Sequence, residues 1–252
     1  MAVNLEGKVV LVTGSGRGVG RGIVDALAAE GASVVASVHH GEDADPLIAA
    51  VGGPVKAPVC DVTVRGDVEA AVAVAVDAFG RLDAVVHNAV SNRSNEITEL
   101  ESAPPELYAE HASVSIRALL YLAQASFPYL SARHGSFVVL TSPAGIPGTP
   151  DRALYAAVKG AQRGFVKALA REWGAHGVRV NGLAPLAMTP ALERAFAGDP
   201  TLRQRLERVV PFGWFGDPAV DIGPAAAFLC SDASRYVTGQ TLAVSGGRFT
   251  AL

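Results

Sequence analysis

A tyrosine and a lysine in the second half of the chain have the side-chain types and the spacing of an acid–base pair. Tyr155 and Lys159 are four residues apart, and in a helix this separation puts both side chains on one face. A free tyrosine has a pKa near ~10, so its phenol is a poor acid at neutral pH. Because a nearby ammonium group favours the phenolate, we expect Lys159 to lower the pKa of Tyr155 toward a working range.

Ser142 supplies a hydroxyl group that we expect at the same place. It follows the apolar run 136–140, which has the composition of a buried strand, and the helical pattern that carries Tyr155 comes next. In open α/β sheets, ligands bind at the carboxyl ends of the strands. The sequence therefore predicts that the three catalytic candidates, Ser142, Tyr155 and Lys159, converge at this edge of a sheet.

A glycine-rich segment near the start of the chain has the properties of a phosphate-binding loop. It reads Thr13-Gly14-Ser15-Gly16-Arg17-Gly18-Val19-Gly20 and lies between an apolar run and the first helical pattern. Glycine lets a phosphate approach main-chain N–H groups, and a helix N-terminus adds partial positive charge. In this position the segment predicts a dinucleotide site. The expected contacts are Gly14, Ser15, Arg17, Gly18, Val19 and Gly20.

The end of the second apolar run bears on which dinucleotide binds. Sites that prefer NAD usually place an acidic residue there, for the ribose 2′-hydroxyl. Here the run ends in Ser37-Val38-His39-His40, and the nearest acids follow at Glu42 and Asp43. A cation at Arg17, a small hydroxyl and no carboxylate suit a 2′-phosphate better. The sequence therefore predicts NADP(H) rather than NAD(H), with Ser37 and His39 among the contacts.

The elements that must position these groups alternate along the chain. Short β-branched runs, apolar on both faces as buried parallel strands are, occur at 9–12, 33–38, 55–60, 84–87, 136–140, 178–183 and 241–244. Helical stripes between them cover 19–28, 68–79 and 154–169. This alternation predicts an α/β fold. We expect a Rossmann-like, doubly wound parallel sheet of about seven strands with helices on both faces, in three layers α/β/α.

The length of the chain and one unusual segment define the expected domain organisation. The 252 residues fit a single dinucleotide-binding domain over 1–252 better than two small domains, and no linker or internal repeat divides them. The segment 188–210 does not fit a crossover between strands, and it has the pattern of a short helical pair with several prolines. Because it follows the carboxyl end of a strand, we predict a substrate lid around 186–213.

The composition excludes several other classes of protein. Apolar residues make up 50% of the chain and charged residues 18%, which predicts a large core rather than disorder. A net charge of −3 without a basic block argues against a surface that binds nucleic acid. The two cysteines, Cys60 and Cys230, do not make a metal cluster, so no metal is expected. With no long apolar stretch and no signal-peptide pattern, we expect a cytoplasmic protein that does not enter a membrane.

Several short motifs, taken in order, carry a family resemblance. They are Thr13-Gly14-x-x-x-Gly18-x-Gly20, Asp61-Val62, Asn88-Ala89, Ser142, Tyr155-x-x-x-Lys159, Val180-Asn181 and Thr238-Gly239. In their order and spacing, over residues 5–249, they resemble the short-chain dehydrogenase/reductase family. No single motif is decisive, whereas the whole series is very specific.

The resemblance implies an oxidoreductase of the ketoreductase type and gives its residues roles. Tyr155 would be the general acid in reduction and the base in oxidation. Lys159 would lower the pKa of Tyr155 and hold the nicotinamide ribose, and Ser142 would bind the carbonyl oxygen of the substrate. Asp61 and Val62 would contact the adenine. Further cofactor contacts would come from Asn88, Ala89, Val90, Tyr155, Lys159, Pro185, Leu186, Met188 and Thr189.

The chain departs from the family pattern around the expected site. Ser115 stands where the family usually has an asparagine that supports a water chain to the lysine, and we count Ser115 among the catalytic residues. Val90 and Leu186 replace glycines beside the cofactor. These changes raise an alternative, a catalytically weak or silent NADP(H)-binding sensor or structural subunit. Lys159 and Gly18 argue against dehalogenase chemistry, and the enoyl-reductase branch spaces its tyrosine and lysine more widely.

The side chains expected around the substrate are mostly apolar. They are Ile146, Pro147, Leu154, Leu186, Met188, Leu192, Phe196, Phe212 and Trp214. Such a pocket predicts a hydrophobic ketone, aldehyde or secondary alcohol as the small-molecule partner. Family members are commonly tetramers that pack the helices around 105–130 and 152–173, so the resemblance implies a homotetramer or homodimer.

Overall fold

The computed structural model describes residues 3–250, and its centre is one parallel sheet of seven strands. The strands are β1 (Val9–Thr13), β2 (Ser33–Ser37), β3 (Val55–Lys56), β4 (Ala84–His87), β5 (Ser136–Leu140), β6 (Arg179–Pro185) and β7 (Thr241–Val244). Their order in the sheet is β3-β2-β1-β4-β5-β6-β7. The direction of winding reverses between β1 and β4, and open α/β sheets bind ligands at such a switch point. The predicted doubly wound parallel sheet is confirmed.

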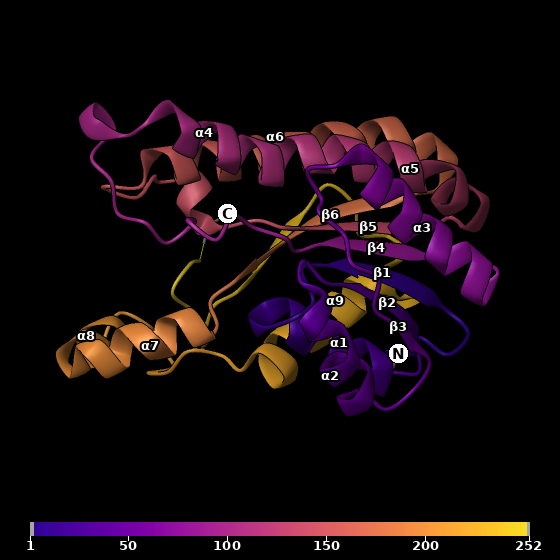
Figure 1. Ribbon diagram of the computed structural model, residues 1–252, viewed down its shortest axis with the longest axis horizontal. Helices are drawn as coiled ribbons and strands as arrows, with labels where there is room; N and C mark the ends of the chain where they lie inside the picture. The colour runs from indigo at the N-terminus through magenta and orange to yellow at the C-terminus, as the bar shows by residue number, and fades with distance from the viewer. Residues whose placement is uncertain (1–2, 251–252) are drawn as a thin grey trace.

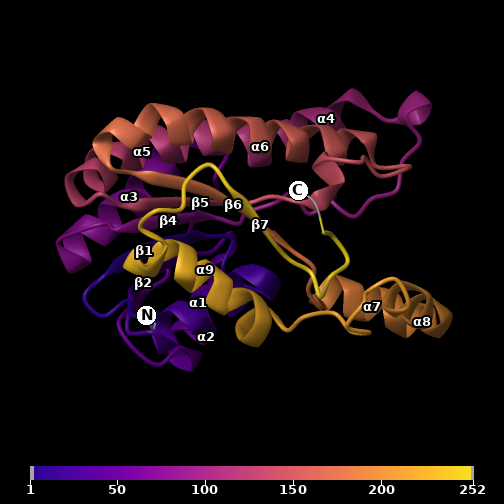
Figure 2. The same ribbon diagram turned by 180° about the vertical axis from the view of Figure 1, so that it is seen from behind.

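Helices cover both faces of this sheet, as Figures 1 and 2 show from opposite sides. One face carries α1 (Gly18–Ala29), α2 (Ala44–Ala50) and α9 (Gly223–Cys230). The other face carries α3 (Arg65–Phe79), α4 (Pro105–Ala112), α5 (Ala118–Arg133) and α6 (Ala153–Trp173). The three layers predicted from the sequence are therefore present. Within residues 3–250, no helix is both long and apolar enough to cross a membrane.

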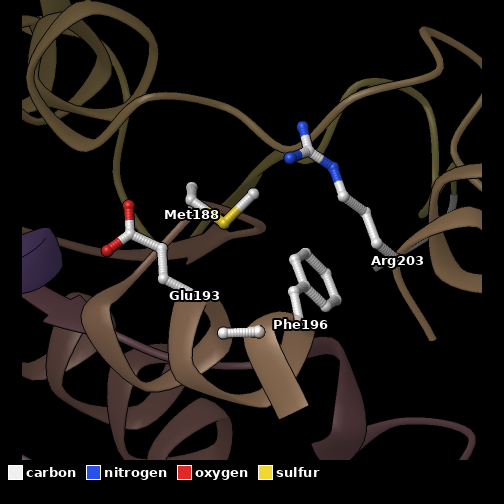
Figure 3. Close-up of a pocket in the computed structure, with 5 residues that line it drawn as sticks. Met188, Glu193, Phe196 and Arg203 are labelled. Atoms are coloured by element: carbon white, nitrogen blue, oxygen red, sulfur yellow. The ribbon is translucent and has the colours of Figure 1, made fainter. Parts of the chain in front are cut away.

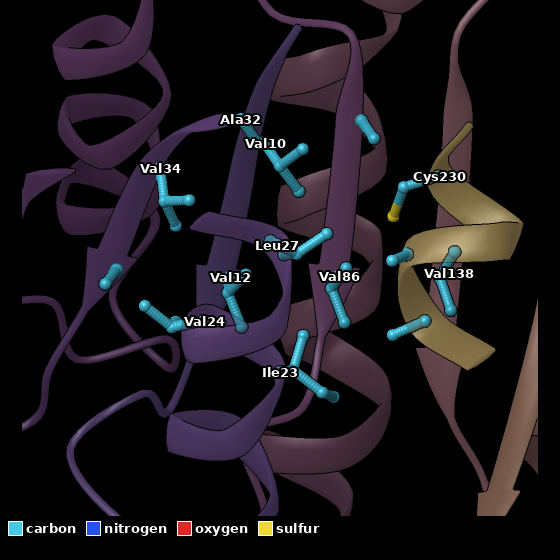
Figure 4. Close-up of a cluster of buried hydrophobic side chains, with 14 of the residues drawn as sticks. Val10, Val12, Ile23, Val24, Leu27, Ala32, Val34, Val86, Val138 and Cys230 are labelled. Carbon is cyan, nitrogen blue, oxygen red and sulfur yellow. The ribbon is translucent and has the colours of Figure 1, made fainter. Parts of the chain in front are cut away.

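Two apolar cores lie on either side of the sheet, because its strands are apolar on both faces. Leu11 packs into the core on the side of α3, α5 and α6, and its neighbour Val12 packs into the core on the side of α1. Figure 4 shows this second core, where Val12 lies near Ile23 and Leu27 of α1. Complete burial of an aliphatic side chain of this size stabilises the fold by about 1.5–3 kcal/mol. The packing fixes α1 with its N-terminus at the carboxyl end of β1.

The third strand is shorter than the predicted run 55–60. Regular pairing ends at Lys56, and only an isolated bridge between Val38 and Val59 follows. Pro58 explains the interruption, since proline has no N–H group to donate to a strand ladder. Its carbonyl oxygen still accepts a hydrogen bond of 3.0 Å from the N–H group of Val38. The third strand was predicted at the correct place, but its predicted end at residue 60 was wrong.

A widened helical turn that the sequence analysis did not predict joins α4 to α5. Residues Ser113–Arg117 form one π-helical segment between the two helices. Turns of this kind are rare and occur often at functional sites. This one contains Ser115, which is 1% exposed.

Two short helices, α7 (Pro190–Gly198) and α8 (Pro200–Glu207), follow β6. Thr189 caps α7 by accepting a hydrogen bond from the N–H group of Leu192. The carboxylate of Asp199 caps α8 in the same way. In both views the pair lies apart from the helices that cover the sheet (Figures 1 and 2). The predicted helical pair is confirmed, and its action as a substrate lid stays a prediction.

Candidate active site

The glycine-rich loop connects β1 to α1 at the carboxyl edge of the sheet. Gly14 has a φ of +67°, a backbone conformation that favours glycine. A Cβ atom on Gly20 would overlap the carbonyl oxygen of Gly14 and the side-chain amide of Asn88. The first turn of α1 thus packs directly on the end of β1 and on the segment after β4. The same close packing brings main-chain N–H groups to the switch point of the sheet.

The N-terminus of α1 has N–H groups that fit an anion. Arg17 precedes the helix in an extended conformation, and no side chain within residues 3–250 caps the helix. The first N–H groups of a helix have no partner inside it and form the positive end of its dipole. Those of Gly18, Val19 and Gly20 therefore suit the pyrophosphate of a dinucleotide.

Ser15, an expected cofactor contact, uses its own hydrogen-bond donors within the protein. Its side chain is fully buried, and its hydroxyl donates a hydrogen bond of 2.9 Å to the carbonyl oxygen of Val12. Its N–H group donates at 2.9 Å to the carbonyl oxygen of Ser37. Both donors of Ser15 hold the loop against the ends of β1 and β2. The residue shapes the phosphate loop without offering it a donor.

Hydrogen bonds hold the end of β4 against the end of β1. The side-chain amide of Asn88 donates to the carbonyl oxygens of Thr13, at 3.1 Å, and of Gly14, at 2.9 Å. In return, the Thr13 hydroxyl accepts from the N–H groups of Asn88, at 3.1 Å, and Ala89, at 3.2 Å. Asn88 and Ala89 thus lie beside the glycine loop, as a cofactor site at this edge requires.

Thr13 also determines which ring nitrogen of the buried His87 carries the proton. The hydroxyl oxygen of Thr13 accepts two N–H groups, so its single proton is directed at Nδ1 of His87, 3.1 Å away. The Nε2 atom then carries the ring proton. It lies near the backbone of Val114 without a well-formed hydrogen bond to any residue from 3 to 250. Burial, and secondarily the charge of Lys159, lowers the pKa of His87 to about 3, so the ring is neutral.

Close packing of α6 brings the three catalytic candidates together. Ser142 lies two residues after the end of β5 and begins a 3₁₀ turn, Pro143–Gly145, by accepting a hydrogen bond of 3.2 Å from the N–H group of Ala144. A Cβ atom on Gly145 would overlap the backbone of α6 at Lys159 and Gly160. Only glycine allows this approach. This close approach puts the Ser142 hydroxyl beside Tyr155. A hydrogen bond from Ser142 accordingly lowers the pKa of Tyr155.

The electrostatics of Tyr155 differ from the expectation. Burial of the phenol raises its pKa, and the Ser142 hydroxyl and the charge of Arg152 oppose that effect only in part. The guanidinium carbon of Arg152 lies 4.5 Å from the centroid of the Tyr155 ring, whereas Nζ of Lys159 lies 5.7 Å from it. Lys159 is not among the causes that lower the pKa. The phenol is therefore protonated at neutral pH, and the cation that favours its ionisation in this structure is Arg152.

Lys159 directs its ammonium group elsewhere. Its side chain is 3% exposed, and Nζ donates to the carbonyl oxygen of Leu140 at 2.8 Å and to Oε1 of Gln162 at 2.9 Å. Burial lowers the pKa of Lys159 to about 7, so the amine is only partly charged at neutral pH. Lys159 has therefore lost its proton at the higher pH where Tyr155 ionises, and it does not favour the phenolate.

Ser115 differs in its contacts from the role expected of it. Its hydroxyl is buried and makes no hydrogen bond with any described residue. Its carbonyl oxygen accepts from Nε2 of Gln162 at 3.0 Å. The connection between the widened turn and Lys159 is therefore the Gln162 amide. Gln162 was not predicted from the sequence, although a polar side chain three residues after Lys159, on the apolar face of the helix, was a readable signal.

The expected adenosine side combines exposed and buried groups. His39 is exposed at the end of β2, and Ser37 and Val62 are buried near it. The Asp61 carboxylate accepts hydrogen bonds from the N–H group and hydroxyl of Thr63, which outweigh burial and hold its pKa below the ordinary range. A Cβ atom on Gly16 would lie 2.9 Å from Oδ2 of Asp43. Asp43, which follows the expected position of an acid by several residues in the sequence, therefore lies beside the loop, and this weakens the sequence argument for a 2′-phosphate.

The segment after β6 runs back toward the glycine loop. The N–H group of Leu186 donates to the carbonyl oxygen of Val244, and that of Met188 donates to Gly216, both at 2.8 Å. A Cβ atom on Gly18 would lie 3.9 Å from a methyl group of Thr189. Thr189 is thus beside the N-terminus of α1, which suits a cofactor contact. Pro185 and Leu186 are half-buried, and Val90, on the opposite side after β4, is exposed.

A cavity of about 510 Å³ lies between Met188 and the helices α7 and α8. Figure 3 shows its apolar residues Met188 and Phe196, with Glu193 and Arg203 at opposite sides. Met188 and Phe196 were expected there, and the two charged residues were not. Phe212 and Trp214, also expected to line a pocket, are 63% and 54% exposed and stack on each other. Among the described residues, no cluster of histidine, cysteine and acidic side chains fits a metal ion.

Comparisons with known proteins agree over nearly the whole chain. A family model described as "Enoyl-(Acyl carrier protein) reductase" matches residues 14–248. The chain is 35% identical to a 2,5-dichloro-2,5-cyclohexadiene-1,4-diol dehydrogenase of Sphingobium indicum, over 99% of each protein. It is 34% identical to the 3-oxoacyl-[acyl-carrier-protein] reductase of Escherichia coli, over 98% of this chain and 99% of that protein. Among solved structures, a 3-ketoacyl-(acyl-carrier-protein) reductase from Brucella melitensis complexed with NADH matches with a TM-score of 0.88 and 31% identity, over 97% of this chain and 99% of that one.

Proposed function

The chain belongs to the short-chain dehydrogenase/reductase family, and we propose that it transfers hydride between a nicotinamide dinucleotide and a carbonyl or secondary alcohol group of a small, mostly apolar molecule. One observation carries the proposal. Ser142, Tyr155 and Lys159 lie at the carboxyl edge of the sheet, the same edge at which the uncapped N-terminus of α1 follows the glycine loop. A proton donor and a phosphate site at one edge are what such a reaction needs.

The residues divide the chemistry between them. When bound, the nicotinamide supplies or accepts the hydride at the substrate carbon. Ser142 donates a hydrogen bond to the substrate oxygen and orients it. Tyr155, whose pKa is raised by burial, is protonated at neutral pH and donates that proton to the oxygen as negative charge develops there. In the reverse direction its phenolate removes the proton from the alcohol.

Two nearby cations support proton transfer by Tyr155. The Arg152 guanidinium over its ring stabilises the phenolate that forms when the proton leaves. The Lys159 amine, one helical turn away, is the group that would hold the hydroxyls of the nicotinamide ribose. An amine with a pKa of about 7 can gain or lose a proton at neutral pH. Lys159 is therefore suited to renew the proton of Tyr155 after each turnover.

Arg17 supports NADP(H) as the preferred cofactor. Its side chain is exposed, and Nη2 donates to Oδ1 of Asn92 at 3.2 Å, so the guanidinium can turn toward a 2′-phosphate at little cost. The hydroxyl of Ser37 and the His39 ring at the end of β2 add donors. The carboxylate of Asp43 beside Gly16 opposes this preference. We also propose a homotetramer or homodimer, packed through α4 to α6, that works in the cytoplasm.

Binding and turnover test this proposal in one experiment. NADPH and NADH are titrated by fluorescence, and oxidation of the bound dinucleotide by a panel of apolar ketones and aldehydes is then followed in the same cuvette. We expect saturable binding, tighter for NADPH, and turnover of at least one panel member. Binding without turnover in either direction, across a broad panel, would favour the silent binder instead.

A further inference from the structure

The Lys159 ammonium group has a defined set of partners. It is 3% exposed, and its bonds to the carbonyl oxygen of Leu140 and to Oε1 of Gln162 use two of its three N–H groups. One N–H group is left for a ligand. Both acceptors are neutral, and within residues 3–250 no carboxylate forms an ion pair with Lys159. Only two uncharged oxygen atoms therefore stabilise the protonated form of this lysine among the described residues.

The second of these acceptors, Gln162, is itself held in one orientation. Its side chain is fully buried, and Nε2 donates to the carbonyl oxygen of Ser115 at 3.0 Å. The reverse orientation of the amide would put NH₂ against the ammonium group and oxygen against oxygen. Since an ammonium group can only donate and a carbonyl oxygen can only accept, both contacts select the same orientation. The widened turn at Ser113–Arg117 thereby fixes an oxygen atom beside Nζ of Lys159.

The titratable groups around Lys159 come from three elements. On β4, the His87 ring is neutral and buried. On α6, Tyr155 lies one turn before the lysine, and Arg152 covers the ring of Tyr155 at the start of the helix. On α4, the ring of His111 lies 6.4 Å from that of Tyr155. None of these groups is an anion, so none offsets the cost of burying a charge.

We propose that Gln162 is a positioning residue of this site, which holds the Lys159 ammonium group at the carboxyl edge of β5 and favours its protonated form. A hydrogen bond to the charged form of a buried group favours that form. Without the Gln162 oxygen, burial would be opposed by the Leu140 carbonyl alone. Lys159 would then lose its proton at lower pH, and at neutral pH a smaller fraction of the protein would hold a proton on Lys159 that can be returned to Tyr155. The consequence for turnover rests on the proposed function, whereas the charge of Lys159 can be measured in a protein without any activity.

The experiment is a titration of the lysine side chains by NMR in protein labelled with ¹³C at lysine Cε. The chain has only Lys8, Lys56, Lys159 and Lys167, and the Lys159 signal is identified by its loss in Lys159→Arg. Gln162→Met keeps the size of the side chain and removes the acceptor, and Gln162→Glu keeps an acceptor and adds charge. Val166→Ala is the matched control, because Val166 is fully buried one turn later on α6 and has no polar atom.

The two substitutions should move the pKa of Lys159 in opposite directions. We expect a fall of about one unit in Gln162→Met and a rise of at least about one unit in Gln162→Glu. Val166→Ala should lower the melting temperature and leave the pKa of Lys159 unchanged. If these substitutions acted only by loosening the helix, all three variants would shift the pKa of Lys159 in the same direction, and this result would contradict the proposal. An unchanged pKa in Gln162→Glu would overturn the proposal, even if Gln162→Met does not fold.

A second readout tests whether the effect is confined to Lys159. The phenolate of Tyr155 is titrated by ultraviolet difference absorbance against Tyr155→Phe, without cofactor or substrate. Because Lys159 is already neutral at the pH where Tyr155 ionises, we expect an unchanged pKa of Tyr155 in Gln162→Met. In an active enzyme, the limb of the pH profile that reports Lys159 should move to lower pH. If no substrate is turned over, the proposed function fails while these titrations still decide the role of Gln162. A Tyr155 pKa that moves together with that of Lys159 would indicate a general disturbance of the site and would overturn the positioning role.

Discussion

The guanidinium group of Arg152 covers the ring of Tyr155, with 4.5 Å between the guanidinium carbon and the ring centroid. Arg152 is held there from the loop after β4, because Nη2 donates to the carbonyl oxygen of Ser94 and to Oδ1 of Asn95. Its charge lowers the pKa of Tyr155 against the larger, raising effect of burial. The arginine at the N-cap of α6 thus performs part of the electrostatic role that the sequence assigns to Lys159.

Removal of the Arg152 charge should therefore raise the pKa of Tyr155 further. In Arg152→Met, we expect the apparent pKa of alcohol oxidation, which needs the phenolate, to rise by roughly half a unit to one unit. Arg152→Lys should retain part of the effect. Arg235→Met is the control, because it removes an arginine away from the site. Its neighbour Ser234 contacts Arg179 at the amino end of β6, the end opposite to the site. Identical pH profiles of kcat/KM in Arg152→Met and Arg235→Met would contradict this account.

Two substitutions beside the glycine loop test the preference between the dinucleotides. Arg17→Ala should weaken NADPH binding by about tenfold and NADH binding much less, because only NADPH carries the 2′-phosphate. Asp43→Asn removes the carboxylate beside Gly16 and should favour NADPH instead. The dissociation constants are measured by fluorescence titration. If Arg17→Ala weakens both dinucleotides alike, Arg17 is a general phosphate contact and does not select NADP(H).

Leu186 occupies a position next to the expected nicotinamide pocket, and its size should limit the substrate. Leu186→Gly should raise kcat/KM for bulky ketones relative to small ones, by roughly 10-fold or more across a size series. The smallest ketone of the series is the internal control for general damage to the enzyme. The same relative kcat/KM across the whole series in both proteins would remove this role.

His87 should make the fold sensitive to acid. Its folded pKa of about 3 lies below the ordinary 6.5, so its contribution to stability is present above pH 6.5 and is lost as the pH falls toward 3. Between pH 7 and 5 this effect amounts to about 2 kcal/mol of unfolding free energy. His87→Asn should reduce that loss, as measured by urea denaturation at the two pH values. An equal loss in both proteins would show that other groups cause the acid sensitivity.

The sequence predicts the sheet and the meeting of Ser142, Tyr155 and Lys159 because both follow from periodicity and parallel topology. Strands that are apolar on both faces must lie inside a parallel sheet, and their carboxyl ends must share an edge. The partners of Lys159 do not follow in this way. They depend on packing between α6 and the widened turn at Ser115, which are distant in the sequence. The direction of the Tyr155 pKa shift likewise depends on burial, which no local spacing specifies.

Replacement of the proposed proton donor is the most direct test of the central claim. Tyr155→Phe removes the phenolic hydroxyl and keeps the ring under Arg152, so the fold and the dinucleotide site should be preserved. We expect unchanged dissociation constants for NADPH and NADH, and a kcat for ketone reduction lower on the order of 10²-fold or more. Turnover by Tyr155→Phe equal to that of the unaltered protein would contradict the account.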